Sequence, residues 1–490
     1  MTLANLTRPG NVIAPQPSAP PASIWHQQSF QLDYSFPVVF TREAFAPHNP
    51  DFRHVLTLRE PQRRQRVAVF LDAGVAHAMP ALVAQIHAYA AAHADAIEII
   101  GEIVLLDGGE ACKNDGDLVA RLIEALSSRA IDRHSYAVAI GGGAVLDAVG
   151  YAAAIFHRGV RHIRFPTTVL AQDDSGVGVK NAVNWQGQKN LLGTFAPPWA
   201  VINDAAFIDI LPAREKRAGM AEAVKVALIR DRAFFLQIEQ QVEALASFAS
   251  AALNQLIQRS AALHMQQIAH GGDPFERGSA RPLDYGHWVA HKLERLSHHR
   301  LSHGEAVAIG LALDAHYSVL AGLLSAGEDM RIYRLLTRLG FTLWHEQLLA
   351  QDEHGRAQVL QGLAEFREHL GGELTLTLLA AIGSGVEVHE MDGALVARSI
   401  GWLQQLHQMN NLMHDPMNEQ LNDQINERLN DQMNEQMNDQ VNEQMNTQMN
   451  ERPNLHKPPA LHFPSPALPP AAAKLSSHLP PLPVANRATG

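Results

Sequence analysis

Short apolar segments rich in β-branched residues alternate with Ala-rich segments of helical spacing between residues 29 and 204, and this alternation most constrains the fold. The segments predicted as buried strands are VAVFLD (67–72), IEIIGEIVLLDG (97–108), YAVAIGGG (136–143), HIRFPTT (162–168) and WAVIND (199–204). Helical stretches such as 76–93 and 116–129 lie between them. Strands that alternate with helices predict an α/β domain with a parallel sheet, which we place at residues 25–210.

The pattern changes after Leu211-Pro212. The segments with helical spacing are then 213–265, 283–297, 303–322, 327–339 and 391–406. They predict a second, all-helical domain over residues 211–408. The run TLTLLAAIG (375–383) fits either a strand or a buried connector.

Both ends of the chain have compositions that cannot build a core. Residues 1–24 and 453–490 are rich in proline and small or polar residues, which predicts a disordered arm and a disordered tail. Within the segment 409–452, a tetrapeptide of the type MNEQ repeats from Met417 to Arg452. Its apolar residues form a stripe that drifts by about 40° per repeat around a helix. The repeat is interpreted as a low-complexity expansion, with a weak helical association stripe as the alternative.

Composition excludes several classes of protein. A formal charge of −11 without a basic run argues against nucleic-acid binding. The single cysteine, Cys112, allows no intrachain disulfide and no thiolate metal cluster. No charged segment precedes an apolar one at the N-terminus, and no apolar run reaches the roughly 20 residues of a membrane span. We expect a cytoplasmic protein that binds no membrane.

Two segments of the α/β part are candidates for ligand binding. The sequence GGGAVLD (141–147) follows a strand and opens a helix, where glycines let backbone N–H groups approach a pyrophosphate. A tight strand-to-helix turn explains it equally well, and its spacing is not the common Rossmann one. The stretch 165–195 is polar and loop-rich, as segments that line a site are, although a solvated surface loop is the alternative.

Two segments of the helical part carry candidate metal ligands. Glu222 and Lys225 share a helical face, which by itself is most often a surface ion pair. His287 and His291 lie four apart, and His303 opens the next helix. Glu222, His287 and His303 could form a one-carboxylate, two-imidazole set with open positions, as in catalytic zinc sites, although paired histidines are more often structural or solvated.

Taken together, in order and spacing, these four segments resemble the 3-dehydroquinate synthase family of sugar-phosphate cyclases over roughly residues 65–325. The resemblance implies a Rossmann-like NAD-binding domain followed by a helical metal-binding domain, and an enzyme that is a carbon–oxygen lyase. The implied metal ligands are Glu222, His287 and His303, which would hold Zn²⁺ or Co²⁺. The implied NAD-binding residues are Asp72, Glu110, Lys113, Gly142, Gly143, Asp147, Thr167, Thr168 and Lys189. The implied substrate and catalytic residues are Asp174, Lys180, Asn190, Lys225, His291 and Arg158. The family reaches the last of these across a dimer interface, which implies a homodimer.

The chemistry implied by the resemblance starts from a phosphorylated keto-sugar. Bound NAD transiently oxidises a hydroxyl, which acidifies the neighbouring C–H bond. Phosphate then leaves by β-elimination, the hydride returns, and an aldol step closes the ring. The metal acts as a Lewis acid. Lys180, Asn190 and Arg158 would bind phosphate, while Asp174, Lys225 and His291 would manage protons.

Several positions depart from dehydroquinate synthase proper. The family's GGKT is Gly178-Val179-Lys180-Asn181 here, and an asparagine before the first metal histidine is Asp284. A pocket arginine is replaced by Ala280, with Arg281 one place away, and a pocket lysine by His264. The family's C-terminal basic segment has no counterpart. The combination of the family's motifs with these departures resembles the Ebo-cluster type of cyclase. The loss of basic residues predicts that the substrate is a C7 keto-sugar phosphate without a carboxylate.

Two other functions remain as alternatives. A metal- and NAD-dependent polyol dehydrogenase shares the two-domain plan but needs no phosphate-binding residues. A non-catalytic binding protein on the same fold would not need to keep all three metal ligands.

Overall fold

The α/β part of the chain is built on a seven-stranded sheet in a computed structural model that describes residues 25–30, 32–186, 188–275, 283–369 and 374–413. The strand order is β1-β9-β6-β5-β2-β3, with β4 also paired to β2, and every pair is parallel. The strands are β1 (Val38–Thr41), β2 (Gln65–Asp72), β3 (Ile97–Ile99), β4 (Val104–Leu106), β5 (Tyr136–Gly141), β6 (Arg161–Pro166) and β9 (Ala200–Asp204). The predicted parallel α/β architecture is therefore confirmed.

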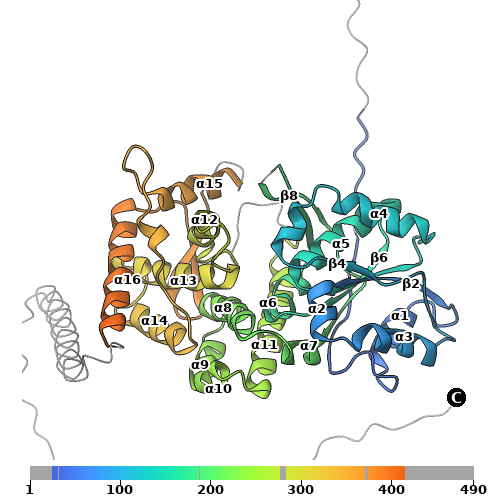
Figure 1. The fold of residues 1–490 in the computed structure, drawn as a ribbon. Coiled ribbons are helices and arrows are strands. Elements are labelled where there is room, and N and C mark those ends of the chain that lie inside the picture. Colours follow the sequence, from blue (N-terminus) through green and yellow to red (C-terminus); the bar gives the residue numbers. More distant parts are fainter. Residues whose placement is uncertain (1–24, 31, 187, 276–282, 370–373, 414–490) are drawn as a thin grey trace, which may run out of the picture. The chain divides into compact units, whose positions relative to one another are not determined.

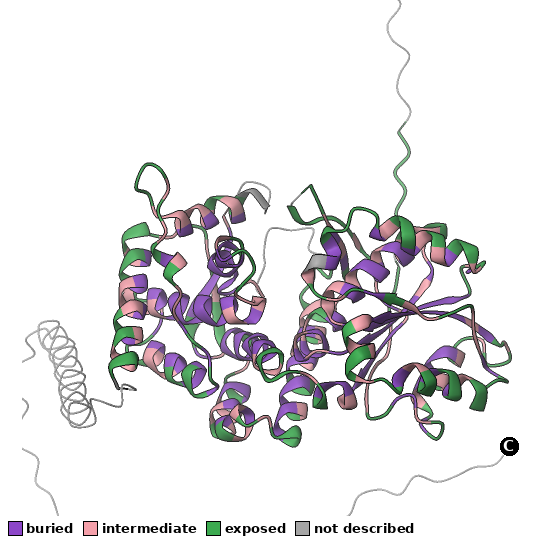
Figure 2. Cartoon of the chain, viewed as in Figure 1, coloured by how far each residue is buried: buried purple, intermediate pink, exposed green. Residues whose placement is uncertain are grey.

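The central strands β2, β5, β6 and β9 are buried along almost their whole length because both faces of the sheet are covered. In β2, Val67, Val69 and Leu71 pack into one hydrophobic core, while Ala68 and Phe70 point into a second core. Helices α1 (Asp51–Thr57) and α3 (Leu82–Ala92) cover the first face, and α4 (Leu118–Ser128) and α5 (Gly143–Ile155) cover the second (Figure 1). Figure 2 shows the strands buried between these layers.

Some elements differ from the sequence prediction. The segment 97–108 was expected to be one strand, but the chain turns at Gly101, which has a φ of 70°, and forms β3 and β4. The helix expected at 76–93 is divided at Pro80 into α2 (Ala73–Ala78) and α3, since a proline inside a helix removes a backbone donor. Strand β1 was not predicted.

The loop-rich stretch 165–195 has more regular structure than its polar composition indicates. It contains α6 (Val169–Asp173), the 3₁₀ turn η3 (Ser175–Val177) and an antiparallel hairpin of β7 (Lys180–Trp185) and β8 (Gln188–Phe195). Two further 3₁₀ turns, η1 (Glu110–Asn114) and η2 (Phe156–Arg158), and the short helix α7 (Ala205–Asp209) complete the α/β part.

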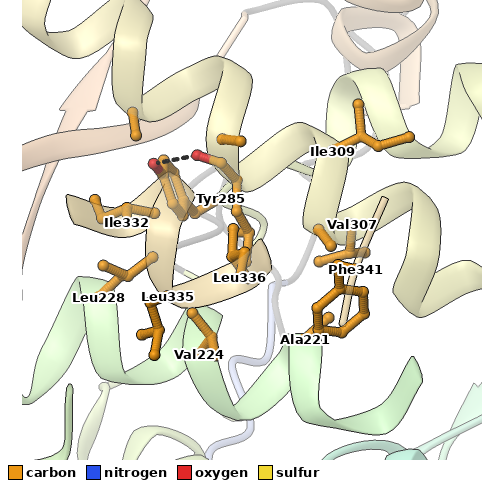
Figure 3. Packing of buried hydrophobic residues seen from close by; sticks show 14 of the residues in the cluster. Ala221, Val224, Leu228, Tyr285, Val307, Ile309, Ile332, Leu335, Leu336 and Phe341 are labelled. Carbon is orange, nitrogen blue, oxygen red and sulfur yellow. Dashed lines mark hydrogen bonds between the residues drawn. The ribbon is translucent and has the colours of Figure 1, made fainter. Parts of the chain in front are cut away.

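The second part of the chain is helical, as predicted, and has its own large hydrophobic core. Its helices are α8 (Ala213–Arg230), α9 (Arg232–Gln240), α10 (Val242–Ala246), α11 (Ser250–His270), α12 (His287–Leu296), α13 (His303–Leu320), α14 (Glu328–Arg338), α15 (Gln361–His369) and α16 (Gly393–Met413), with 3₁₀ turns η4 (Glu346–Leu349) and η5 (Gln358–Leu360). In Figure 3, Leu228 of α8 and Leu335 of α14 lie near Tyr285, whose hydroxyl donates a 3.0 Å hydrogen bond to the Leu311 carbonyl. The α/β part contacts this core through α6, which packs against α8 and α11.

The undecided run 375–383 forms a strand, β10 (Leu376–Ala381), which pairs antiparallel with β11 (Ser384–Val388). Helix α16 continues to Met413, five residues beyond the boundary expected at Gln408. The arm 1–24 and the tail from residue 414 lie outside the described residues, so their predicted disorder stays a prediction. None of the described helices combines the length and apolar character that crossing a bilayer requires.

Candidate active site

The turn between β5 and α5 places two predicted cofactor residues at a helix N-terminus. Gly142 is the N-cap of α5 and Gly143 its first residue. A Cβ atom on Gly143 would lie 2.9 Å from Ser175 Oγ, so a larger residue here would displace that hydroxyl. Thr168 caps the neighbouring helix α6, where its Oγ1 accepts from Ala171 N at 3.1 Å. A Cβ atom on Gly142 would lie 3.3 Å from Thr168 Cγ2, so the N-terminus of α5 lies beside the start of α6. A helix N-terminus that opens on a glycine turn suits a pyrophosphate.

Three other predicted cofactor residues surround this turn. Asp72 ends β2, and its carboxylate accepts from Gly74 N at 2.8 Å, while burial raises its pKa. Lys113 is buried on η1 and donates to Asp147 Oδ2 at 3.0 Å and also to Asn190 Oδ1. Asn190 was predicted to bind the substrate phosphate, but in this structure its side chain faces the cofactor residue Lys113.

The β7–β8 hairpin is fixed to η1 by a residue that the sequence did not single out. Asn184 Oδ1 accepts from Asn190 N at 2.8 Å, and Asn184 Nδ2 donates to Glu110 Oε1 at 3.1 Å. Asn190 has a φ of 56°, a left-handed conformation that asparagine tolerates. The hairpin that carries Lys189 and Asn190 is therefore held beside Glu110.

The three predicted metal ligands meet from three helices. Glu222 lies in α8, His287 begins α12 and His303 begins α13. Glu222 Oε1 is 3.5 Å from His287 Nε2 and 3.2 Å from His303 Nε2. One potential ligand atom from each of the three residues falls within 4.8 Å of the others, a spacing that suits a single ion.

Glycines allow the helices to approach closely enough for this meeting. A Cβ atom on Gly304 would lie 1.9 Å from the Ala218 carbonyl oxygen, so α13 touches α8 directly beside His303. A Cβ atom on Gly310 would lie 2.1 Å from the Gly286 carbonyl oxygen, which brings α13 against the start of α12. The two histidines therefore face Glu222 because the backbones are in contact.

The donor set fits a divalent ion. Both carboxylate oxygens of Glu222 are buried; Oε1 faces the two imidazoles and Oε2 faces the Lys225 ammonium. His287 Nδ1 donates to the Tyr285 carbonyl at 3.1 Å, and His303 Nδ1 donates to Glu294 Oε1 at 2.7 Å. Each imidazole therefore directs its Nε2 lone pair toward Glu222, as catalytic zinc sites with three protein ligands require.

Charges around these ligands favour the ionised carboxylate. Burial would raise the pKa of Glu222, but the Lys225 ammonium and hydrogen bonds from His287 and His303 hold it well below its usual range. Burial opposes the charged form of His303 too, yet hydrogen bonds to Glu222 and Glu294 raise its pKa to about 9 in the metal-free chain. Glu294, which sequence reasoning missed, accepts a hydrogen bond from the Nδ1 of His303 and so orients this candidate ligand.

His264 and Asp174 form a pair beside the metal-ligand set. His264 is buried on α11, donates from Nδ1 to the Ser260 carbonyl at 3.1 Å, and places Nε2 2.9 Å from Asp174 Oδ1. Burial would raise the pKa of Asp174, but His264 and Lys225 lower it to about 2. His264, which stands at the position of the family's pocket lysine, thus contacts the Asp174 carboxylate of the same chain.

Some of the remaining predicted residues lie close to the candidate metal ligands and others do not. The His291 ring centroid is 5.4 Å from that of His287 and 6.0 Å from that of His303. Lys189 Nζ donates to Glu294 Oε2 at 2.9 Å, and Lys180 begins β7. Buried Thr167 follows β6.

Arg158 is exposed on η2, before the amino end of β6, so the single chain does not bring it to this site. Ala280 and Arg281 lie outside the described residues.

Comparison with known proteins agrees with this arrangement. Residues 103–218 match the model for the 3-dehydroquinate synthase N-terminal region, and residues 219–361 match that for the C-terminal region. A 2-epi-5-epi-valiolone synthase of Streptomyces glaucescens is 36% identical over 288 residues, which cover 59% of this chain and 72% of the relative. A 3-dehydroquinate synthase of Pseudomonas syringae pv. syringae is 36% identical over 288 residues, 59% of this chain and 76% of the relative.

A solved structure shares the whole architecture. The 2-epi-5-epi-valiolone synthase of Streptomyces hygroscopicus subsp. jinggangensis, with NAD⁺ and Zn²⁺ bound, superposes with a TM-score of 0.67 at 26% identity. The match covers 78% of this chain and 99% of that one. The predicted family and fold are confirmed: the chain belongs to the 3-dehydroquinate synthase family of sugar-phosphate cyclases.

Proposed function

We propose that this protein closes a phosphorylated C7 keto-sugar into a carbocycle with loss of phosphate. The observation that carries the proposal is the meeting of buried Glu222 with His287 and His303, whose Nε2 atoms lie 3.5 Å and 3.2 Å from Glu222 Oε1. Bound NAD would supply a reversible hydride acceptor, and a zinc ion on these three residues would supply Lewis-acid polarisation.

The side chains around the metal ligands have the chemistry that the reaction needs. Lys225 is buried next to Glu222, and its pKa is raised because the attraction of Glu222 and Asp174 outweighs the effect of burial. We assign Lys225, Asp174 and His291 to holding substrate hydroxyls and moving protons. Lys180 and Asn190 would bind the phosphate, which requires Asn190 to exchange its contact with Lys113 for the substrate.

We propose that the substrate carries no carboxylate. The His264 imidazole, at the position of a lost lysine, already faces Asp174, so it is not free to bind a second anion. Asp284 adds a negative charge near Lys225. Losing one charged partner costs about 1.5–3 kcal/mol, roughly one to two decades in binding. The two relatives matched at equal identity have different names, so they do not decide the substrate.

The test compares kcat/KM for sedoheptulose 7-phosphate with that for the carboxylated heptulosonate phosphate. We expect the sugar without the carboxylate to be preferred by at least about tenfold. Preference for the carboxylated sugar would instead identify an ordinary dehydroquinate synthase.

A separate measurement distinguishes the cyclase from the alternative polyol dehydrogenase. A cyclase releases phosphate without net NADH, because the hydride returns to the substrate in each turnover. A dehydrogenase accumulates NADH in step with product. Lys225→Gln should abolish phosphate release, whereas Lys216→Gln, a change near the start of the same helix and away from the candidate site, should leave it unchanged.

We also propose a cytoplasmic homodimer in which Arg158 serves the partner's site. Arg158 is exposed and lies before the amino end of β6, whereas Asp174 follows the carboxyl end of that strand. Mixing Arg158→Ala with Lys225→Gln chains should restore activity to about a quarter of the wild-type value, since half of the dimers then hold one intact site. Absence of recovery in a mixed dimer would show that Arg158 acts within its own chain, and full activity of Arg158→Ala alone would show that it has no role.

A further inference from the structure

Arg164 is a buried cation that the proposed chemistry does not use. It lies in β6, where it is only 1% exposed. Nη1 donates to the Gly176 carbonyl at 3.0 Å and to the Gly178 carbonyl at 2.7 Å. Nη2 donates to the Lys180 carbonyl at 3.1 Å and to Asn181 Oδ1 at 2.7 Å. One guanidinium thus binds four oxygens within the segment 176–181.

This segment follows Asp174 and contains Lys180, two residues of the candidate site. Three of the four acceptors are backbone carbonyls, so the hydrogen bonds fix the path of the chain directly. A planar fork with donors at fixed angles suits this task, which a lysine ammonium cannot reproduce. The position of the Lys180 backbone therefore depends on Arg164.

Asn181 completes the arrangement and is itself tightly enclosed. Its Nδ2 donates to the Ala196 carbonyl at 3.2 Å, which ties the end of β8 to the same cluster. A Cβ atom on Gly150 of α5 would lie 1.9 Å from Asn181 Oδ1. The glycine in α5 thus provides the space in which Asn181 accepts from Arg164.

The cost of burying this charge indicates a specific role. Among the described residues Arg164 has no ion-pair partner, and its acceptors are neutral dipoles. Burial lowers its pKa to about 10, against a small opposing effect of Asp147, so the guanidinium stays charged at neutral pH. A buried arginine without a carboxylate is expensive, and an apolar residue would fill the space at less cost.

We propose that Arg164 is a positioning residue, which holds the segment 176–181 so that Asp174 and Lys180 face a phosphorylated substrate. Its role in turnover rests on the proposed function. The ordering of the segment by Arg164 does not, and it can be measured without substrate.

The experiment uses Arg164→Lys, which keeps the charge but removes the fork, and Gly150→Ala, which keeps Arg164 and displaces Asn181. The matched control is Arg161→Lys in the same strand. Arg161 pairs with Glu60 at 2.5 Å and stacks 4.5 Å from the Trp199 ring, and neither partner is a candidate site residue. Hydrogen exchange of residues 174–181 is measured on the full chain without added ligand. Affinity for inorganic phosphate is then measured on protein loaded with zinc and NAD, followed by KM and kcat.

We expect exchange in this segment to accelerate by about tenfold or more in Arg164→Lys and Gly150→Ala, and to stay unchanged in the control. The KM for the sugar phosphate and the dissociation constant for inorganic phosphate should rise about tenfold in the same two variants, with zinc content and NAD affinity retained. If Arg164→Lys does not fold, Gly150→Ala carries the test.

Equal exchange in all three variants would overturn the proposal. Faster exchange with unchanged phosphate affinity would also overturn it, since the ordered segment would then not serve the substrate. A parallel loss of zinc and NAD would reduce Arg164 to a general core residue. A wild-type protein that turns over no sugar phosphate contradicts the proposed function, while exchange and phosphate affinity still decide the role of Arg164.

Discussion

His303 donates a 2.7 Å hydrogen bond from Nδ1 to Glu294 Oε1, and the other oxygen of Glu294 accepts from Lys189 at 2.9 Å. A single buried carboxylate thus connects a candidate metal ligand with a residue predicted to contact NAD. Such an outer partner fixes the tautomer of a ligating histidine and increases its basicity. Glu294 therefore contacts both the candidate metal site and the candidate cofactor site.

Replacing Glu294 with glutamine should weaken metal binding. The amide keeps the shape but removes the charge that supports His303, so zinc affinity should fall by roughly 10–100-fold. Competition with a chromogenic chelator measures this. The control is Glu365→Gln, since Glu365 accepts from Lys292 of the same helix at 2.9 Å without touching a ligand. Equal zinc affinities in the two variants would contradict the assignment.

One divalent ion should bind per chain on Glu222, His287 and His303. Elemental analysis of His287→Ala should show most of the metal lost, because only two protein ligands remain. His299→Ala, an exposed neighbour beyond the end of α12, serves as the control and should keep its metal. Retention of a full equivalent by His287→Ala would exclude this ligand set.

Stabilisation by zinc should increase with pH. In the metal-free chain the pKa of His303 is raised to about 9, so its proton stabilises the fold below about pH 6.5 and this contribution is lost as pH rises through 9. Zinc requires the neutral imidazole and must displace that proton at lower pH. The zinc-induced rise in Tm should therefore grow between pH 6.5 and pH 9. A constant shift, or the same pH dependence in His303→Gln, would refute this.

The tail should be dispensable only beyond α16. Asn410 Nδ2 donates to the Tyr333 hydroxyl at 3.0 Å, and Met409 packs against the helical core. Truncation after Met413 should leave Tm and phosphate release unchanged, because the repeat and proline-rich residues that it removes cannot build a core. Truncation after Gln408, the boundary expected from the repeat, should lower Tm by roughly 2–4 °C. A large loss of Tm or activity after the cut at Met413 would mean that the repeat packs on the enzyme.

The sequence by itself determined the class of fold, and it predicted the candidate metal ligands. Strand and helix periodicities are local properties, so alternation of the two predicts a parallel sheet without knowledge of contacts. Glu222, His287 and His303 can be predicted as ligands because four segments together resemble the 3-dehydroquinate synthase family in order and spacing. The break at Gly101 was missed, since the apolar run 97–108 continues across it.

Only the tertiary structure decided which residues support that set. Glu294 to His303, His264 to Asp174, and Arg164 to the segment 176–181 are contacts between different elements of the chain. No local pattern marks them, because a buried charge is stabilised by whatever partner the packing of separate elements brings within hydrogen-bond distance. Gly304 lies against the Ala218 backbone and Gly150 against the Asn181 side chain, and such contacts exist only once the helices and the sheet have packed.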